Sequence, residues 1–233
     1  MTTTRTDNEF QIRGLEVRYG ADRVVRDMNL SAAPGRVTCV LGPNGAGKTT
    51  TLRAGLGLVR RHAGECQRPD RTNVLLDDGG LIPGLTVRQH VTARALSAGV
   101  PTGCVDDLID TVEMSGAAAM KIGRCSMGMK RRTALAAALV GDPQLVVLDE
   151  PSAGLDPEGI RWLGTLLRGL ARQGVAVLTT THHLAEAAAM TDDVAVIAGG
   201  TLRFSGPLEE MTSGTTTGSL DDAFFALTGG EAR

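Results

Sequence analysis

The chain contains 233 residues, of which 42% are hydrophobic and 21% charged, and its net charge at pH 7 is −2. This length fits one large α/β domain and is too short for two nucleotide-binding domains. The balanced charge, with a pI near 6.1, predicts no nucleic-acid partner and no attraction to an anionic membrane surface.

We expect neither a secretion signal nor a membrane-spanning segment. The polar start, MTTTRTDNEF, lacks an apolar core, and no apolar run approaches the ~18 residues that a membrane-spanning helix needs. The four cysteines form no C-x-x-C pair and no zinc spacing, which is typical of reduced thiols in a cytosolic protein. The sequence therefore predicts a soluble, intracellular protein with a disordered N-terminal tail at residues 1–9.

Apolar runs bounded by glycine and proline predict strands and helices in alternation, which is typical of an α/β fold. The expected strands occupy residues 11–17, 24–30, 37–41, 74–76, 145–148, 175–179 and 194–197. The expected helices run from Lys48 to near Gly64, in pieces through 86–139, and over 157–173, 184–189 and 220–227. The composition of residues 213–218 predicts a flexible segment before the last helix.

Residues 42–50, GPNGAGKTT, form a complete G-x-x-x-x-G-K-T phosphate-binding loop between an apolar strand and a helix. Its glycines let backbone N–H groups approach phosphate oxygens, and the helix N-terminus adds positive partial charge. Lys48 is expected to reach the β- and γ-phosphates, and the Thr49 hydroxyl to hold Mg²⁺. The expected phosphate-binding residues are Gly42, Asn44, Gly45, Gly47, Lys48, Thr49 and Thr50.

Two adjacent carboxylates, Asp149 and Glu150, follow the apolar strand at 145–148. Asp149 is expected to hold Mg²⁺ through water, and Glu150 to act as the base that polarises the attacking water. Two acids at a strand end can also be a purely structural feature. Their position about 100 residues beyond a complete phosphate loop favours the catalytic interpretation.

A second anion-binding feature begins a helix, where Ser126 and Gly128 precede the run TALAAAL. Alone this signal is weak, because Ser and Gly begin many helices. The order of phosphate loop, Ser-x-Gly helix, LDEP and GLD resembles the ATP-binding domain of ABC transporters, over residues 10–211. The resemblance implies a P-loop NTPase core with a mixed sheet, an N-terminal antiparallel β-subdomain and an inserted helical subdomain at about 86–139.

The same resemblance implies roles for individual residues. Tyr19 matches the aromatic on which the family stacks adenine, although an aromatic there can also belong to a core or an edge strand. His182 matches the switch histidine that contacts the γ-phosphate, whereas His183 is expected to be a solvated neighbour. Asp156 matches the aspartate at the family's dimer interface. Trp162 matches no family residue, and core packing is expected for it.

The sequence departs from the family pattern at two places. In the signature, Met127 and Met129 replace a glycine and a glutamine, but the signature serine and second glycine are kept, so a working signature is expected. Asp77 stands where the family usually has the glutamine of the coupling loop, and Asp78 is the alternative for that position. A carboxylate there could reach the ligand shell of Mg²⁺.

The resemblance implies an ATPase that uses ATP and Mg²⁺ and works as a homodimer, in which each ATP lies between two copies. It also implies a separate multi-helix membrane permease, which would place the protein in the cytoplasm on the inner face of the cell membrane. The length, the signature and the tail, residues 206–210 followed by 219–229, resemble subunits of exporters of drugs, lipids or peptide antibiotics. Residues 212–233 are expected to form a flexible segment and a short C-terminal helix. The alternative is a non-transport ABC ATPase that regulates or assembles soluble partners.

Overall fold

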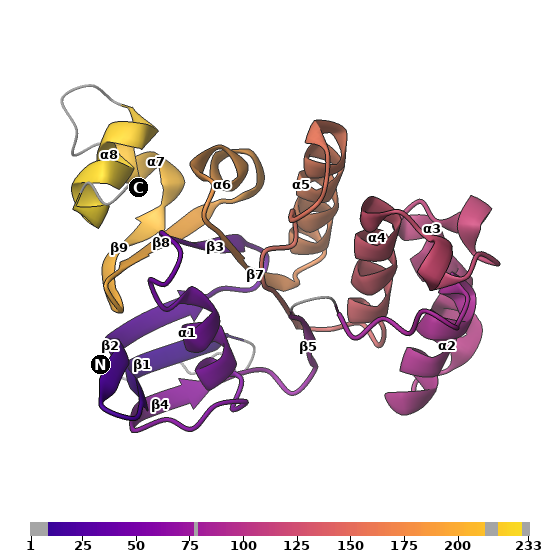
Figure 1. The fold of residues 1–233 in the computed structure, drawn as a ribbon, viewed down its shortest axis with the longest axis horizontal. Coiled ribbons are helices and arrows are strands. Elements are labelled where there is room, and N and C mark those ends of the chain that lie inside the picture. The colour runs from indigo at the N-terminus through magenta and orange to yellow at the C-terminus, as the bar shows by residue number, and fades with distance from the viewer. Residues whose placement is uncertain (1–8, 77–78, 213–218, 230–233) are drawn as a thin grey trace.

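The computed structural model describes residues 9–76, 79–212 and 219–229, and it contains two β-sheets, with most of the helices around the central one or at one end of the molecule (Figure 1). The first sheet is antiparallel. Its strands, in spatial order, are β2 (Asp22–Ala32), β1 (Phe10–Tyr19) and β4 (Ala63–Gln67).

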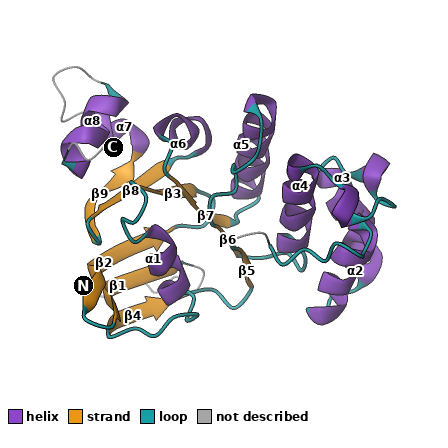
Figure 2. Ribbon diagram, in the orientation of Figure 1, coloured by secondary structure: helices purple, strands orange, loops and turns teal. Residues whose placement is uncertain are grey.

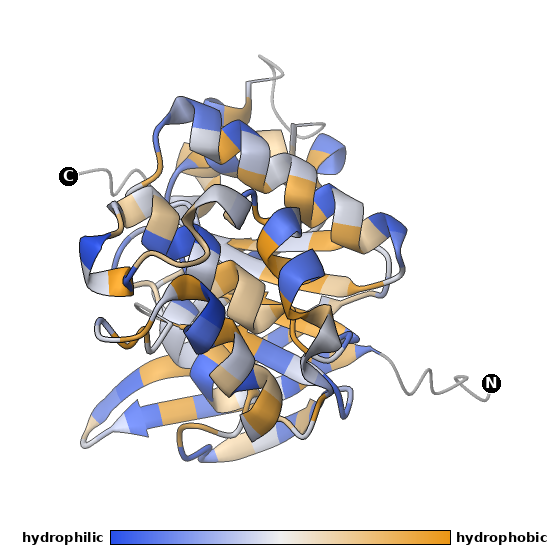
Figure 3. Ribbon diagram, turned by 90° about the vertical axis from the view of Figure 1, so that its right-hand side faces the viewer, coloured by the Kyte–Doolittle hydropathy of each residue, from blue (hydrophilic) through white to orange (hydrophobic). Residues whose placement is uncertain are grey.

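The second sheet forms the centre of the molecule and is mainly parallel. Its strands, in spatial order, are β5 (Thr72–Leu75), β6 (Leu145–Leu148), β7 (Ala176–Thr181), β3 (Val37–Leu41), β8 (Asp193–Ala198) and β9 (Thr201–Pro207). Only the pair β8–β9 is antiparallel among these neighbours. Every residue of β3, β6 and β7 is buried, because both faces of this sheet are covered, and this explains why most of their residues are apolar. Figure 3 shows the hydrophobic residues gathered in these central strands.

The helices cover the central sheet and also form a separate group at one end of the molecule (Figure 2). The separate group contains α2 (Val87–Ser97), α3 (Val105–Thr111) and α4 (Met127–Ala138). The other helices are α1 (Lys48–Gly55), α5 (Pro157–Arg172), α6 (Leu184–Met190), α7 (Leu208–Thr212) and α8 (Leu220–Thr228).

The group α2–α4 shares one hydrophobic core with α5 and with the β5–β6 edge of the sheet. Arg132 of α4 reinforces this contact, since its guanidinium lies 3.8 Å from the ring centroid of Trp162 on α5. The same guanidinium donates to Glu113 at 2.6 Å. Trp162 is therefore partly buried at a junction between two helices, where it packs against the core as expected.

Two further cores hold the remaining elements. The antiparallel sheet and α1 pack on the central sheet, with Phe10, Ile12 and Leu52 completely buried between them. On the other side, α6, α7 and α8 pack on β3 and β8, and Phe224 and Leu227 of α8 take part in this third cluster. The C-terminal helix is thus part of the packed structure.

The predicted end of one helix is wrong, and two strands of the structure were not predicted. The helix after the phosphate loop ends at Gly55 and not near Gly64, because Gly57, with φ of 78°, takes the chain out of the helix. The residues that follow form β4, which pairs with β1 and is exposed or half-exposed along its length, so it shows no apolar alternation. The strand β9 was also not expected, although the Gly199–Gly200 turn before it is a known hairpin signal.

Some sequence predictions fall on residues outside the described part of the chain. These are most of the N-terminal tail, residues 1–8, the segment 213–218 and the two aspartates Asp77 and Asp78. Among the helices that the structure describes, none is both long enough and apolar enough to cross a bilayer.

Candidate active site

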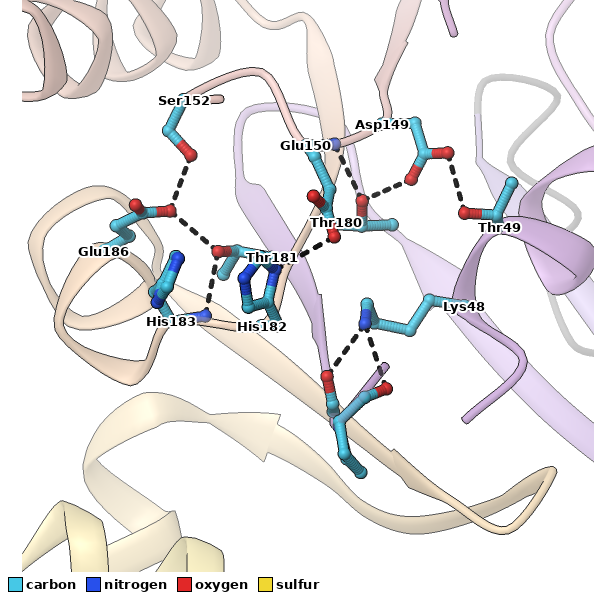
Figure 4. Close-up of polar contacts among 12 residues, drawn as sticks. Lys48, Thr49, Asp149, Glu150, Ser152, Thr180, Thr181, His182, His183 and Glu186 are labelled. Atoms are coloured by element: carbon cyan, nitrogen blue, oxygen red, sulfur yellow. Dashed lines mark hydrogen bonds and ion pairs between the residues drawn. The ribbon is translucent and has the colours of Figure 1, made fainter. Parts of the chain in front are cut away.

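The loop between β3 and α1 folds around the ammonium group of its own lysine. Lys48 is 6% exposed, and its Nζ donates to the carbonyl oxygens of Gly42 at 2.8 Å and Pro43 at 3.2 Å (Figure 4). Gly45 and Gly47 have φ of 79° and 99°, values that favour glycine. A Cβ on Gly42 would lie 2.2 Å from a backbone oxygen of β8. The loop conformation therefore requires its glycines.

The environment of Lys48 fits a phosphate group. Burial lowers the pKa of Lys48, while Glu150 and Asp149 act in the opposite direction. The direct partners of the ammonium are carbonyl oxygens, which are dipoles and carry no full charge. A phosphate would supply the full negative charge that favours a buried cation. The helix N-terminus at Lys48 adds backbone N–H groups to the same place.

A threonine and an aspartate provide oxygen atoms suited to Mg²⁺. The Thr49 hydroxyl donates to Asp149 Oδ2 at 2.8 Å, joining the start of α1 to the end of β6. The other oxygen of Asp149 accepts from the hydroxyl of Thr180 on β7. Hydroxyl and carboxylate oxygens are the ligands that Mg²⁺ prefers. The donor set on these two residues therefore fits this ion.

Glu150 occupies a backbone conformation that is uncommon for its type. Its φ of 46° lies in the left-handed region, which costs a residue with a Cβ on the order of 1–3 kcal/mol. Its carboxylate Oε1 lies 3.0 Å from Nδ1 of His182, and both side chains are about one-third exposed. Because a carboxylate only accepts, Nδ1 carries the shared proton. His182 is thus the histidine that contacts Glu150, while His183 is exposed and its ring lies beside that of His182, 3.9 Å between centroids.

A second hydrogen-bond network lies behind these residues. Glu186 on α6 accepts from Ser152, which follows the two acids, and from Thr181 at the end of β7 at 2.7 Å. Thr181 in turn accepts from the backbone N–H of His183 at 3.1 Å. The segment after Glu150 and the segment that carries the histidines are therefore joined through one carboxylate of α6 (Figure 4).

The remaining predicted site residues lie at helix ends or strand ends. Ser126 caps α4 by accepting from the backbone N–H of Met129 at 3.2 Å, and Asp156 caps α5 by accepting from Gly159 at 2.7 Å. Tyr19 ends β1 and is 51% exposed, which excludes a core role for it. In the described part of the chain, no hydrogen bond or ion pair connects these three side chains to Lys48, Thr49, Asp149 or Glu150.

Sequence reasoning found the loop and the two acids but missed Thr180, Thr181 and Glu186. The available signal was the run of three threonines at 179–181, polar residues inside an otherwise apolar strand. Polar side chains in a buried strand need partners, so this run could have indicated a hydrogen-bonded site. The partners themselves could not be read without the order of the strands.

The strand, glycine loop, helix and strand-end acid define a P-loop nucleotide-binding protein. A family model described as "ABC transporter" matches residues 25–153. The "Nod factor export ATP-binding protein I" of Burkholderia orbicola (strain AU 1054) is 38% identical over 207 residues, which cover 82% of this chain and 68% of that protein. The protein of the same name from Bradyrhizobium diazoefficiens is 33% identical over 208 residues, which cover 80% of this chain and 66% of that protein.

A solved structure described as "Structure of ATP binding subunit of ABC transporter" has the same fold, with a TM-score of 0.83 at 23% identity, covering 94% of this chain and 98% of that one. The present chain belongs to the ABC transporter family, and within that family it is an ATPase. The family and the fold class predicted from the sequence are thereby confirmed.

Proposed function

We propose that this protein hydrolyses ATP to drive export through a separate membrane-spanning subunit. The relatives described above are named as export proteins, which favours export over the alternative of a regulatory module on soluble partners. The observation that carries the proposal is that Lys48, Asp149 and Glu150 lie close together. They meet where the loop that follows β3 approaches the end of β6.

The phosphate loop would hold the nucleotide through its N–H groups and Lys48, whose ammonium would exchange its carbonyl partners for phosphate oxygens. Thr49 and Asp149 would hold Mg²⁺. When bound, Mg²⁺-ATP supplies the phosphoryl group whose transfer to water releases free energy. The exposed ring of Tyr19 offers a face on which adenine can stack.

Glu150 is the proposed general base, and His182 its proposed partner. The carboxylate of Glu150 would take a proton from the attacking water. His182 donates to one oxygen of this carboxylate through Nδ1, which fixes the direction of the other oxygen. In the proposed arrangement, Nε2 of His182 would donate to the γ-phosphate, which requires a proton on both ring nitrogens.

The site would be completed by a second copy of the chain. Ser126 and Gly128, at the N-terminus of α4, are suited to an anion carried by that copy, and Asp156 would lie at the contact. Since this chain has its own Glu150, we propose a homodimer with two active sites. The ATP-binding domain would extend over residues 10–211 and its helical subdomain over about 86–139, and 212–233 would be a separate C-terminal segment whose helix α8 packs on the domain.

We further propose that the protein works in the cytoplasm, on the inner face of the membrane and bound to its permease. The permease would choose the cargo, which we place among drugs, lipids and peptide antibiotics. Asp77, at the coupling-loop position, would be a further Mg²⁺ ligand.

Replacement of the proposed base tests this function. We expect Glu150→Gln to lower ATP turnover about 10²–10⁴-fold while ATP binding is retained, because the amide cannot accept the proton. Turnover is measured by phosphate release and binding by calorimetry. The control is Glu209→Gln, an exposed acid on α7, which should leave both quantities unchanged. Wild-type turnover in the Glu150→Gln variant would overturn the assignment.

A further inference from the structure

Both acids at the end of β6 are tied to one side chain of the neighbouring strand. The hydroxyl of Thr180 donates to Asp149 Oδ1 and accepts from the backbone N–H of Glu150 at 2.9 Å. Thr180 is completely buried. We infer that Thr180 is a positioning residue for ATP hydrolysis, which sets where the carboxylates of Asp149 and Glu150 lie. The inference rests on the proposed function, in which these two residues hold Mg²⁺ and activate water.

The strand register places Thr180 at this point. In the parallel pair β6–β7, Leu148 lies opposite Thr179, so the next residue of each chain segment brings Asp149 beside Thr180. On its other side β7 pairs with β3, which leads directly into the phosphate loop. Side chains alternate along a strand, so Thr180 faces away from the side on which Thr179 and Thr181 lie. Thr180 bonds to Asp149 and to the N–H of Glu150, whereas Thr181 bonds to Glu186 on α6 (Figure 4).

The two hydrogen bonds use the hydroxyl group of Thr180 both as a donor and as an acceptor. The carboxylate of Asp149 only accepts, so it takes the single proton of Thr180. The N–H of Glu150 only donates, so it uses a lone pair of the same oxygen. Serine can make both bonds, whereas valine has the shape of threonine and can make neither.

Each bond restrains a feature that the proposed chemistry needs. Asp149 is held through both oxygens, one by Thr180 and the other by Thr49 at 2.8 Å, which fixes the plane of its carboxylate. Glu150 is held by its N–H at a backbone position with φ of 46°, a conformation that persists only when its surroundings impose it. Without the hydroxyl group of Thr180, the backbone at Glu150 can leave the left-handed conformation, and the carboxylate of Glu150 then moves away from His182.

The same strand offers a matched control. Thr179 is as deeply buried as Thr180, but its hydroxyl has no hydrogen-bond partner within the described residues. Thr179→Val therefore removes a buried hydroxyl without removing a bond, whereas Thr180→Val removes a buried hydroxyl with both bonds. The comparison separates the effect of the bonds from the effect of a valine in β7.

We would compare wild type, Thr180→Val, Thr180→Ser and Thr179→Val as full chains. Hydrogen exchange without nucleotide reports the amide of Glu150, and phosphate release at varied ATP and Mg²⁺ gives kcat, KM and the Mg²⁺ requirement. We expect Thr180→Val to lower kcat about 10–10²-fold, since a displacement near 1 Å has effects of that size. Its Glu150 amide should exchange faster, its Mg²⁺ requirement should rise, and KM for ATP should change little. Thr180→Ser should restore all of these, and Thr179→Val should match wild type.

Two results would overturn the inference. One is wild-type kcat and unchanged exchange at Glu150 in Thr180→Val. The other is an equal loss of activity in Thr180→Val and Thr179→Val, which would indicate a general effect on β7. If Glu150→Gln loses turnover while Thr180→Val keeps it, only this inference fails and the proposed function stands. If the wild-type chain neither binds nor hydrolyses ATP, the proposed function fails and this inference with it.

Discussion

At the scale of single residues, the phosphate loop is organised by the buried ammonium of Lys48. Its bonds to the Gly42 and Pro43 carbonyls show that the loop can surround a charged group, while Asp149 and Glu150 lie just beyond the end of β6. Lys48 is the one residue of the loop 42–50 with a positively charged side chain. In the proposed mechanism, this charge lies beside the phosphates.

We therefore expect Lys48→Ala to weaken ATP binding about 10–100-fold, since a hydrogen bond to a charged group contributes about 1.5–3 kcal/mol. Calorimetric titration with ATP measures the change. A matched control is Thr51→Val on the same helix, because the buried Thr51 hydroxyl has no partner among the described residues. Unchanged affinity in Lys48→Ala would argue against this loop as the phosphate site.

The sequence predicts the residues that act through local spacing. The phosphate loop contains Lys48 and Thr49, and the end of the strand 145–148 is followed by Asp149 and Glu150. The position of each pair depends only on the few residues around it. Thr180 gains its contacts only because β7 lies between β6 and β3, an order that local pattern does not contain. Glu186 likewise needs α6 to fold back onto the segment that follows Glu150.

At the scale of elements, Asp156 supports α5 directly. Its Oδ1 accepts from the N–H of Gly159 at 2.7 Å, which satisfies a helix N-terminal donor. We expect Asp156→Ala to lower the free energy of unfolding by about 0.5–2 kcal/mol, and Asp156→Asn to retain most of it, since asparagine is an equally good cap. Urea unfolding gives both values. Equal stability of the alanine variant and wild type would show that the cap contributes nothing.

On α2, His90 predicts a dependence of stability on pH. His90 is buried, its Nδ1 lacks a partner in the described part of the chain, and burial lowers its pKa. The unfolded chain then binds a proton at higher pH than the folded one. The contribution of buried, uncharged His90 to the free energy of unfolding is complete above the histidine pKa of the unfolded chain, about 6.5. It is lost as the pH falls toward the lower pKa that His90 has in the folded protein.

Urea unfolding at several pH values would measure this effect. We expect the stability of wild type to fall more steeply between about pH 7 and pH 5 than that of His90→Leu, which cannot take up the proton. Parallel curves for the two proteins would contradict the assignment to His90.

Most strands of the central sheet were predicted because burial on both faces leaves a continuous apolar signal in β3, β6 and β8. Two edge strands, β4 of the antiparallel sheet and β9 of the central sheet, were not predicted. β4 and β9 are largely exposed or half-exposed, and each is held mainly by pairing with one neighbour. Such strands are specified by backbone hydrogen bonds to a partner, and this information is not present in their own residues.

At the scale of the whole molecule, the helical group α2–α4 and the nucleotide site are joined through the sheet and α5. Arg132 links α4 to Trp162, while Ser126 and Asp156 begin helices on either side of this junction. In the proposed homodimer, the surface that carries Ser126 would contact ATP bound to the other copy, and Asp156 would lie at the contact between the two copies. Closing and opening of that dimer would then be the movement passed to the permease.

The most direct test of this account is the mass of the Glu150→Gln protein in solution with and without ATP and Mg²⁺. We predict a monomer without nucleotide and a stable dimer with ATP, because binding can join two copies while hydrolysis no longer separates them. The additional change Ser126→Arg, which places a bulky side chain at the start of α4, should abolish the dimer and retain ATP binding. A Glu150→Gln protein that binds ATP and remains monomeric would contradict the shared site.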